Sequence, residues 1–268
     1  MTIISEKYLD LSSYSDQFQN ASPFPHLVLD DFLNDEFFKE LCDVTGAERK
    51  PDSGRKFDTQ HEKNKWISIN DELPHLLSNL INALNSEHWV SNLKVMSRMP
   101  ELTSTQCGNL ELGNYHLMEP GGFLAPHVDH SSEPGTGLPH VLNIILYLSD
   151  RWDDSYGGST TFYDKKGKDI VETVNYKPNR AVIFLHTPYS FHCVEEIKND
   201  IPVARKTLYV DYYSTSMEPY RNLKLPFSNK WFYHGTTFRL PGFLEYFKTK
   251  NYPYTKAMIQ YTLNKFRA

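Results

Sequence analysis

The chain has 268 residues, of which 40% are hydrophobic and 23% are charged, and its formal net charge is -5. This composition is ordinary for a globular protein, and the mild acidity carries no global signature of nucleic-acid binding. There is no run of about 18 apolar residues and no basic leader before an apolar stretch, so we expect neither a membrane span nor a signal peptide. Three scattered cysteines predict a reducing, cytoplasmic environment rather than a disulfide framework.

The first part of the chain predicts short elements in the order strand, helix, loop and helix. Residues 23–30 (PFPHLVLD) indicate a strand entered through prolines. Asn34 can cap a helix whose apolar side chains recur on one face. Residues 50–65 are polar, which predicts a loop. A longer helix follows, with Pro74 in its first turn and an apolar stripe that reaches Leu84.

From about residue 107 the sequence changes to a series of short strands. Alternation predicts a strand over 110–117, and the continuous apolar run over 141–148 predicts a strand buried on both faces. β-Branched and aromatic residues predict three more strands, at 159–163, 181–185 and 205–213. Gly and Pro turn signals separate these strands, a pattern typical of a sandwich or barrel. We therefore expect an α+β fold with a mainly β core and helices at both ends.

The C-terminal segment differs from the rest of the chain in charge. Residues 220–268 contain nine Lys or Arg and one acidic residue, a net +8, so the rest of the chain carries -5 - 8 = -13. For this basic, aromatic segment we favour a lid or packing surface. A homodimer contact is the second choice, and a surface for single-stranded nucleic acid is the third. Residues 254–266 predict an amphipathic terminal helix. Because no linker isolates this helix, we expect one domain over 1–268, with a barrel core at about 107–216 and an extension at 217–268.

A candidate metal site begins with the motif His127-x-Asp129. On a strand, residues two apart point to the same side, so this imidazole and carboxylate can reach one ion. Two later histidines offer the third ligand that an iron site of two imidazoles and one carboxylate needs. His192 opens a strand, whereas His186 stands at a strand end before a turn, so His192 is preferred. His116, His140 and His130 are expected to be packed or solvated. For His130, contact with the substrate is the alternative.

A candidate anion site follows on the strand predicted over 205–213. Arg205 and Thr207 share one face of that strand. A guanidinium and a hydroxyl on an inward face suit the distant carboxylate of a 2-oxo acid, because arginine binds carboxylates through two parallel hydrogen bonds. The structural alternative is a buried ion pair between Arg205 and Asp211.

Together these motifs resemble the Fe(II)/2-oxoglutarate-dependent dioxygenases, in particular their prolyl 4-hydroxylase-like branch. The resemblance extends from about 110 to 214 and includes the segments Pro120-Gly121-Gly122, Leu146 to Asp150, and Gly157 to Thr160. It implies a double-stranded β-helix, which is a jelly-roll or cupin-like barrel. It also implies catalytic iron ligands at His127, Asp129 and His192, and a 2-oxoglutarate site formed by Arg205, Tyr147, Thr207 and Tyr115.

The resemblance further implies Fe(II) as cofactor and 2-oxoglutarate and O2 as co-substrates. An unactivated C–H bond would be hydroxylated while 2-oxoglutarate loses CO2 and becomes succinate. The carboxylate of Asp129 argues against halogenation, but desaturation, epimerisation and ring closure share the same iron ligands. A C-terminal extension that closes over the site favours a small-molecule substrate. The alternatives are a peptidyl-prolyl hydroxylase and a non-catalytic β-barrel binding module.

Overall fold

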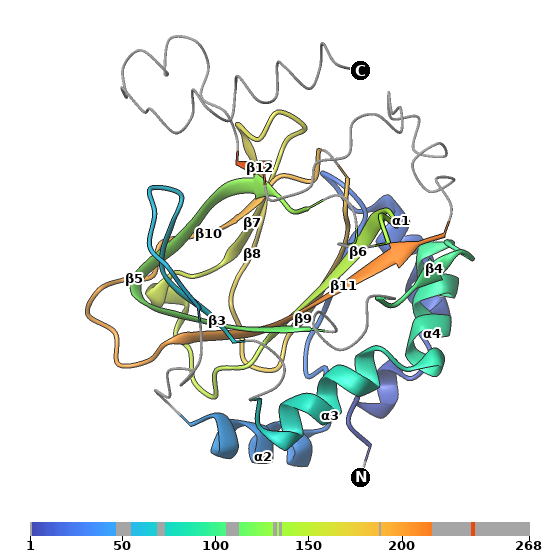
Figure 1. Ribbon diagram of the computed structural model, residues 1–268, viewed down its shortest axis with the longest axis horizontal. Helices are drawn as coiled ribbons and strands as arrows, with labels where there is room; N and C mark the ends of the chain where they lie inside the picture. The colour runs from blue at the N-terminus through green and yellow to red at the C-terminus, as the bar shows by residue number, and fades with distance from the viewer. Residues whose placement is uncertain are drawn as a thin grey trace.

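The computed structural model describes residues 2–46, 55–68, 73–105, 113–130, 133, 136–187, 189–215 and 237–238. Over these residues the protein is a curved antiparallel sheet with helices packed on its outside (Figure 1). None of the described helices is long and apolar enough to cross a membrane. The predicted β core with flanking helices is confirmed for this part of the chain.

The sheet has the strand order β1-β9-β6-β11-β5-β10-β7-β8, and β3 and β12 also pair with β5. The strands are β1 (His26–Leu29), β2 (Arg55–Phe57), β3 (Glu62–Ser68), β4 (Leu102–Thr103), β5 (Asn114–Val128), β6 (His140–Tyr147), β7 (Thr160–Tyr163), β8 (Ile170–Val174), β9 (Ala181–Leu185), β10 (His192–Val194), β11 (Arg205–Ser214) and β12 (Thr237–Phe238). Every residue of β6 is buried, as its continuous apolar sequence predicts.

The long strand β5 joins the two faces of the barrel. Its first half pairs with β11, whereas its second half pairs with β10. Gly121 and Gly122 lie where the strand passes from one partner to the other. Gly121 has a φ of 74°, and a Cβ on Gly122 would lie 2.7 Å from the backbone oxygen of Glu119. These two positions therefore need glycine, and the bend that they permit carries the end of β5 into the barrel.

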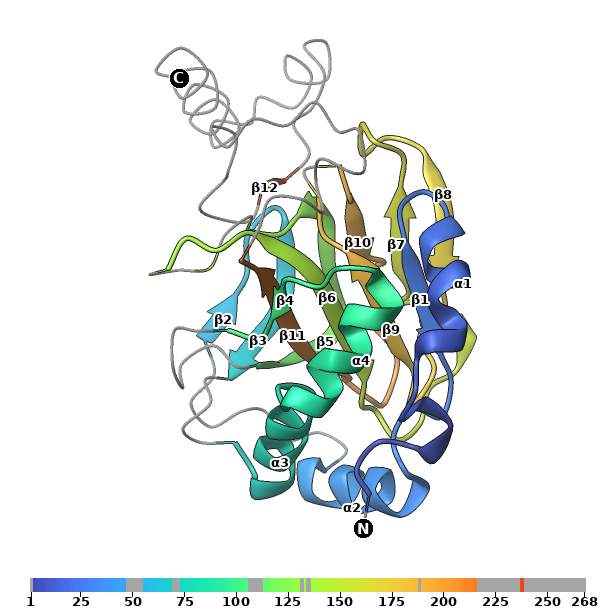
Figure 2. The same cartoon turned by 90° about the vertical axis from the view of Figure 1, so that its right-hand side faces the viewer.

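Among the described residues, four α-helices lie outside the barrel: α1 (Ser15–Asn20), α2 (Asp35–Thr45), α3 (His75–Leu84) and α4 (Glu87–Ser97). Figure 2 shows α3 and α4 lying across the outer face of β6 and β11. The predicted cap of α2 is present, since the Asn34 side chain accepts hydrogen bonds from two backbone N–H groups. The sequence analysis missed α4, which begins after its own N-cap, Ser86. Buried leucines and Trp89 of these helices pack against the outward residues of the sheet and form the main apolar core.

The polar segment that predicts a loop over 50–65 instead contains β2 and part of β3. The hairpin pairs with β5, for example through Trp66 opposite Leu117. Backbone hydrogen bonds to β5 stabilise the hairpin, so it does not need an alternating apolar pattern. Its polar side chains therefore gave no signal for a strand. Most of the extension at 217–268, including the helix predicted at 254–266, lies outside the described residues. Within it the structure describes β12, which pairs with Val128 and His127.

Candidate metal centre

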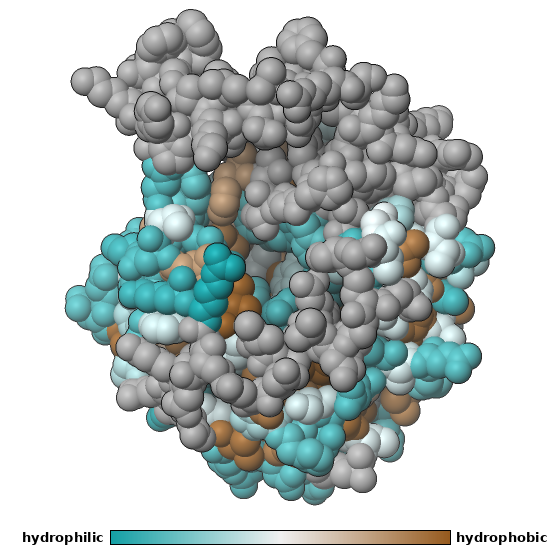
Figure 3. Space-filling model, viewed as in Figure 1, coloured by the Kyte–Doolittle hydropathy of each residue, from teal (hydrophilic) through white to brown (hydrophobic). Residues whose placement is uncertain are grey.

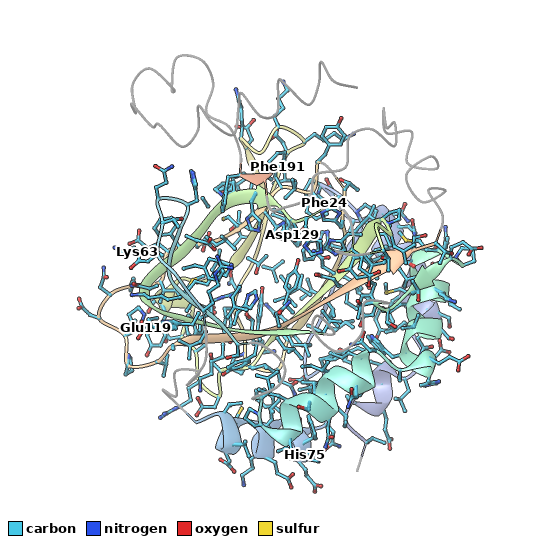
Figure 4. The ribbon with its side chains drawn as sticks, viewed as in Figure 1. Phe24, Lys63, His75, Glu119, Asp129 and Phe191 are labelled. Atoms are coloured by element: carbon cyan, nitrogen blue, oxygen red, sulfur yellow. The ribbon has the colours of Figure 1, made fainter. Side chains whose placement is uncertain are left out.

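A cavity of about 250 Å³ lies inside the barrel. Its walls come from β3, β5, β6, β7, β10 and β11, and Phe238 of β12 also lines it. Figure 3 shows a recess near the centre of this face of the molecule. Asp129 lies within the barrel among side chains from several strands (Figure 4). The cavity thus places side chains from distant parts of the sequence within reach of one ligand.

The structure brings together His127, Asp129 and His192, the three residues predicted to bind a metal. His127 and Asp129 lie at the end of β5, and His192 opens β10 directly opposite His127. His127 Nε2 lies 3.3 Å from Asp129 Oδ1, and His192 Nε2 lies 3.4 Å from Asp129 Oδ2. Both imidazoles are almost completely buried. The three side chains could therefore hold one metal ion among them.

The hydrogen bonds of the two imidazoles favour this use. His127 Nδ1 lies 2.8 Å from the carbonyl oxygen of Ala125, and His192 Nδ1 lies 3.0 Å from that of Ser190. A carbonyl only accepts, so each Nδ1 carries a proton and donates. Burial and the charge of His127 lower the pKa of His192 to about 4, so its ring is neutral at physiological pH. Its Nε2 lone pair then faces the carboxylate, as a metal ligand requires.

Two further side chains orient the carboxylate of Asp129. Its Oδ2 accepts hydrogen bonds from Asn143 Nδ2 at 2.9 Å and from the Tyr209 hydroxyl at 2.5 Å. Burial alone would raise the pKa of Asp129, but the neighbouring histidines outweigh it and hold that pKa well below its ordinary value. Burial and the charge of Asp129 raise the pKa of Tyr209, so the phenol keeps its proton and donates. The sequence analysis missed both partners, although Tyr209 shares the inward alternation of Arg205 and Thr207.

Arg205 lies in the same cavity and is 4% exposed. Its Nε donates to the carbonyl of Gly158 at 2.7 Å, and its guanidinium lies over the rings of Tyr147 and Tyr176. Among the described residues no acidic side chain forms an ion pair with it. Burial lowers the pKa of this guanidinium, which nevertheless stays charged. A buried cation without an acidic neighbour fits an anionic ligand, because the ligand would compensate the cost of burying the charge.

The residues near Arg205 in the structure are only partly those that the sequence analysis predicted. Thr207 lines the cavity, and Tyr147 donates a hydrogen bond of 2.6 Å to Thr160 Oγ1, which lies 3.4 Å from Arg205 Nη2. Thr160 was missed as a site residue, although it ends the Gly-Gly-Ser-Thr segment that carries the resemblance. Asp211 does not pair with Arg205, so the alternative of a buried ion pair between them is wrong.

The prediction that Tyr115 lines the pocket is corrected by the structure. Tyr115 is paired with Leu208 and belongs with it to the apolar core under the helices. The cavity is instead lined by its two neighbours on β5, Asn114 and His116. Neighbouring strand residues face opposite sides, so a shift of one position exchanges the core and cavity faces.

His186, the less favoured candidate for the third ligand, lies beside the centre rather than in it. Its Nδ1 lies 3.0 Å from the carbonyl oxygen of His140, and its Nε2 lies 3.3 Å from the backbone oxygen of Asp129. Burial and the charge of His140 hold the pKa of His186 well below its ordinary value. These contacts give His186 a packing role, and His192 alone of the two reaches the carboxylate of Asp129.

Comparison with known proteins agrees with the family and the fold expected from the sequence. Residues 112–212 match the family model of the 2OG-Fe(II) oxygenase superfamily. No curated protein is similar enough to count as a match. Many solved structures share the fold at low sequence identity, and three of them illustrate the range. A prolyl hydroxylase from Trichoplax adhaerens, in complex with a hypoxia inducible factor peptide, is 16% identical, with a TM-score of 0.54 over 82% of this chain and 95% of that one.

The second is a prolyl-4-hydroxylase from Pseudomonas putida, 14% identical, with a TM-score of 0.53 over 77% of this chain and all of the other. The third is the non-heme alpha ketoglutarate dependent epimerase SnoN from nogalamycin biosynthesis, 11% identical, with a TM-score of 0.50 over 77% of this chain and 84% of the other. These similarities agree with the double-stranded β-helix expected from the sequence.

Proposed function

Since residues 112–212 place this chain in the 2OG-Fe(II) oxygenase superfamily, which uses Fe(II), 2-oxoglutarate and O2, we propose that His127, Asp129 and His192 bind the iron. We further propose that the enzyme hydroxylates an unactivated C–H bond of a small molecule. The observation that carries the proposal is the cavity that contains both the buried His-Asp-His group and the buried Arg205.

The donor set fits the metal. Two imidazoles and one carboxylate suit a non-heme Fe(II) centre and leave coordination positions open for other ligands. Bound Fe(II), with its co-substrates, supplies an oxidation in which one oxygen atom enters a C–H bond and the other enters succinate. The backbone carbonyls of Ala125 and Ser190 orient the two imidazoles, because each accepts a hydrogen bond from an Nδ1 atom and leaves Nε2 directed at the carboxylate. Tyr209 and Asn143 orient the carboxylate of Asp129 through hydrogen bonds to its Oδ2.

Arg205 gives the co-substrate its orientation. The guanidinium and Thr207 offer hydrogen-bond donors to the distal carboxylate of 2-oxoglutarate, and Thr160 and Tyr147 hold the guanidinium in place. Because Arg205 and the metal ligands line one cavity, the two ends of the co-substrate would have separate binding groups. This arrangement orients the co-substrate before the reaction and excludes bulk water from it.

The size and cover of the cavity support a small-molecule substrate. Its volume of about 250 Å³ is near the lower end for ligand pockets, before any co-substrate enters. Phe238 lies with its ring centroid 5.8 Å from that of His127 and 4.5 Å from that of His61. Phe238 of the C-terminal extension therefore reaches the cavity. This contact supports the proposal that the extension covers the cavity as a lid and belongs to the same domain as the barrel. Solved structures with this fold include both a complex with a peptide and an epimerase from nogalamycin biosynthesis, so the fold does not choose between these substrate classes.

Anaerobic titration of the metal-free protein with Fe(II) and 2-oxoglutarate tests the proposal. We expect a weak visible charge-transfer band that saturates at one equivalent and is absent in Asp129→Ala. A folded protein that gives no band would contradict the oxygenase site and indicate a binding module. Succinate release during a screen of small molecules and proline-containing peptides then identifies the substrate class. Turnover with peptides alone would contradict the small-molecule proposal.

A further inference from the structure

A second group of metal-ligating side chains lies beside the first, and the proposed reaction does not use it. This second cluster consists of His130 directly after Asp129, His140 at the start of β6, and Asp211 on β11. Their ligand atoms lie within 4.8 Å of one another. We propose that the second cluster binds a divalent cation of the zinc type. The proposal goes beyond the oxygenase reaction and does not depend on it.

The spacing of the second cluster repeats that of the candidate iron ligands. His140 Nε2 lies 3.3 Å from Asp211 Oδ1, and His130 Nε2 lies 3.6 Å from Asp211 Oδ2. The corresponding distances at Asp129 are 3.3 and 3.4 Å. In both groups one carboxylate turns a separate oxygen toward each of two imidazoles. The two groups therefore offer a cation nearly the same arrangement of donors.

Hydrogen bonds fix the orientation of His140 in the way that a metal ligand needs. His140 Nδ1 lies 2.7 Å from the carbonyl oxygen of His130, so this nitrogen carries a proton and donates. His140 Nε2 then faces Asp211. A backbone carbonyl behind the imidazole sets the tautomer in the same way at His127 and His192.

Asp211 supplies an independent sign that something belongs between these side chains. The residue is 7% exposed, and its Oδ1 accepts no hydrogen bond from any described residue, although His140 Nε2 is only 3.3 Å away. Two metal-ligand atoms can lie this close without hydrogen-bond geometry when both are directed at a cation position between them rather than at each other. A buried carboxylate oxygen without a hydrogen bond is costly, and a bound cation would remove that cost.

The ligand types select the class of cation. Two imidazole nitrogens and one carboxylate are the donors of open zinc sites, which leave a fourth position for a further ligand. His130 and Asp211 both line the cavity, so a cation held there would face the same space as the candidate iron centre. The buried Tyr213 also contacts the second cluster, since its hydroxyl lies 3.2 Å from His130 Nε2.

Counting bound zinc in the full chain tests the proposal. Protein stripped with a chelator is equilibrated in a zinc-buffered solution, and the zinc that it retains is measured by mass spectrometry. We expect two equivalents in the wild type, one in Asp129→Ala, one in Asp211→Asn, and none when these two substitutions are combined. Replacing zinc by Co(II) should give a separate visible spectrum for each site.

Two controls keep the test decisive. Glu172→Gln is the matched control, because Glu172 lies 3.1 Å from His26 Nε2 in a histidine–carboxylate pair that has no third ligand among the described residues. It should leave the zinc count at two. His130→Gln replaces the part-exposed member of the cluster, and it should weaken the second equivalent at least tenfold even if Asp211→Asn fails to fold.

Some results would overturn the second site. Asp129→Ala protein that is folded and binds no zinc would do so, as would a double variant that still keeps its zinc. Loss of the Fe(II) band together with a retained Asp211-dependent zinc would instead contradict only the proposed oxygenase site. The two proposals can therefore fail separately.

Discussion

The hydroxyl of Tyr209 donates a hydrogen bond of 2.5 Å to Oδ2 of Asp129. Tyr209 belongs to β11, which is paired with the first half of β5, whereas Asp129 follows the far end of β5. One strand thus supplies both the candidate co-substrate cation, Arg205, and the group that orients the carboxylate. This geometry links the two halves of the site and leads to the first prediction.

Replacing Tyr209 with phenylalanine should weaken Fe(II) binding about 10-fold or more, because partners behind a ligand typically contribute 10- to 100-fold to metal affinity. Anaerobic competition with a chelating dye measures the effect. Tyr212→Phe is the matched control, since Tyr212 lies on the opposite face of β11 and bonds Trp89 Nε1 and the carbonyl of Leu84. It should leave iron affinity unchanged while lowering the free energy of unfolding by about 1–3 kcal/mol. Equal iron affinity in both variants would contradict the role of Tyr209.

Replacing His192 with alanine should abolish iron binding, whereas His186→Ala should keep it and lower only thermal stability. The reason is geometric, since only His192 directs its Nε2 toward the Asp129 carboxylate. Calorimetric titration with Fe(II) under nitrogen, with circular dichroism as a check on folding, separates the two variants. Iron binding that survives His192→Ala and is lost in His186→Ala would make His186 the third ligand.

Replacing Arg205 with glutamine should raise the Kd for 2-oxoglutarate about 10- to 100-fold and leave the Fe(II) Kd within a few-fold. This range follows from the ~1.5–3 kcal/mol that hydrogen bonds to charged groups contribute. Intrinsic fluorescence quenching by 2-oxoglutarate can follow binding in the presence of Mn(II). Arg180→Gln is the control, because Arg180 pairs with Asp30 outside the cavity. If Arg205→Gln weakened both ligands equally, the residue would have a structural role.

Asp30 should contribute pH-dependent stability. Hydrogen bonds from Arg180, together with Lys177, lower its pKa from 3.8 to about 2 although partial burial opposes them. Its folded pKa is below its unfolded value, so its contribution is fully present above pH ~4 and is lost as the pH falls through 2. Because the side chain is 39% exposed, solvent screening reduces the contribution to about 1 kcal/mol at pH 7.

Urea unfolding of wild type and Asp30→Asn between pH 7 and pH 3 measures this contribution. The difference in free energy of unfolding should be largest near neutral pH and fall to about half near pH 3. A difference that does not change over this range would assign the effect of the substitution to packing rather than to charge.

Much of the candidate site could be predicted from local sequence patterns. The spacing of His127 and Asp129 on a strand, the place of His192 at the start of a strand, and the alternation from Arg205 to Thr207 depend only on the two-residue period of a strand. The cap at Asn34 is equally local. Such features can be recognised because neighbours in the sequence are sufficient to define them.

Other features depended on which strands lie together. The resemblance placed Tyr115 in the cavity instead of its neighbours, and the period of β5 could not correct this because it does not show which face of the strand points inward. The hairpin of β2 and β3 has a polar sequence and exists as a sheet edge through its pairing with β5. Helix α4 follows α3 so closely that the break at Ser86 was overlooked.

The sequence by itself determined the order of the candidate ligands and the mainly β core that carries them, because strand periodicity and short motifs are local properties. Only the tertiary structure placed Tyr209 and Asn143 on Asp129, and Asp211 between His130 and His140. These groups come from three strands separated by up to 81 positions along the chain, between His130 and Asp211. Long-range strand pairing and burial bring them together, and neither can be read from neighbouring residues.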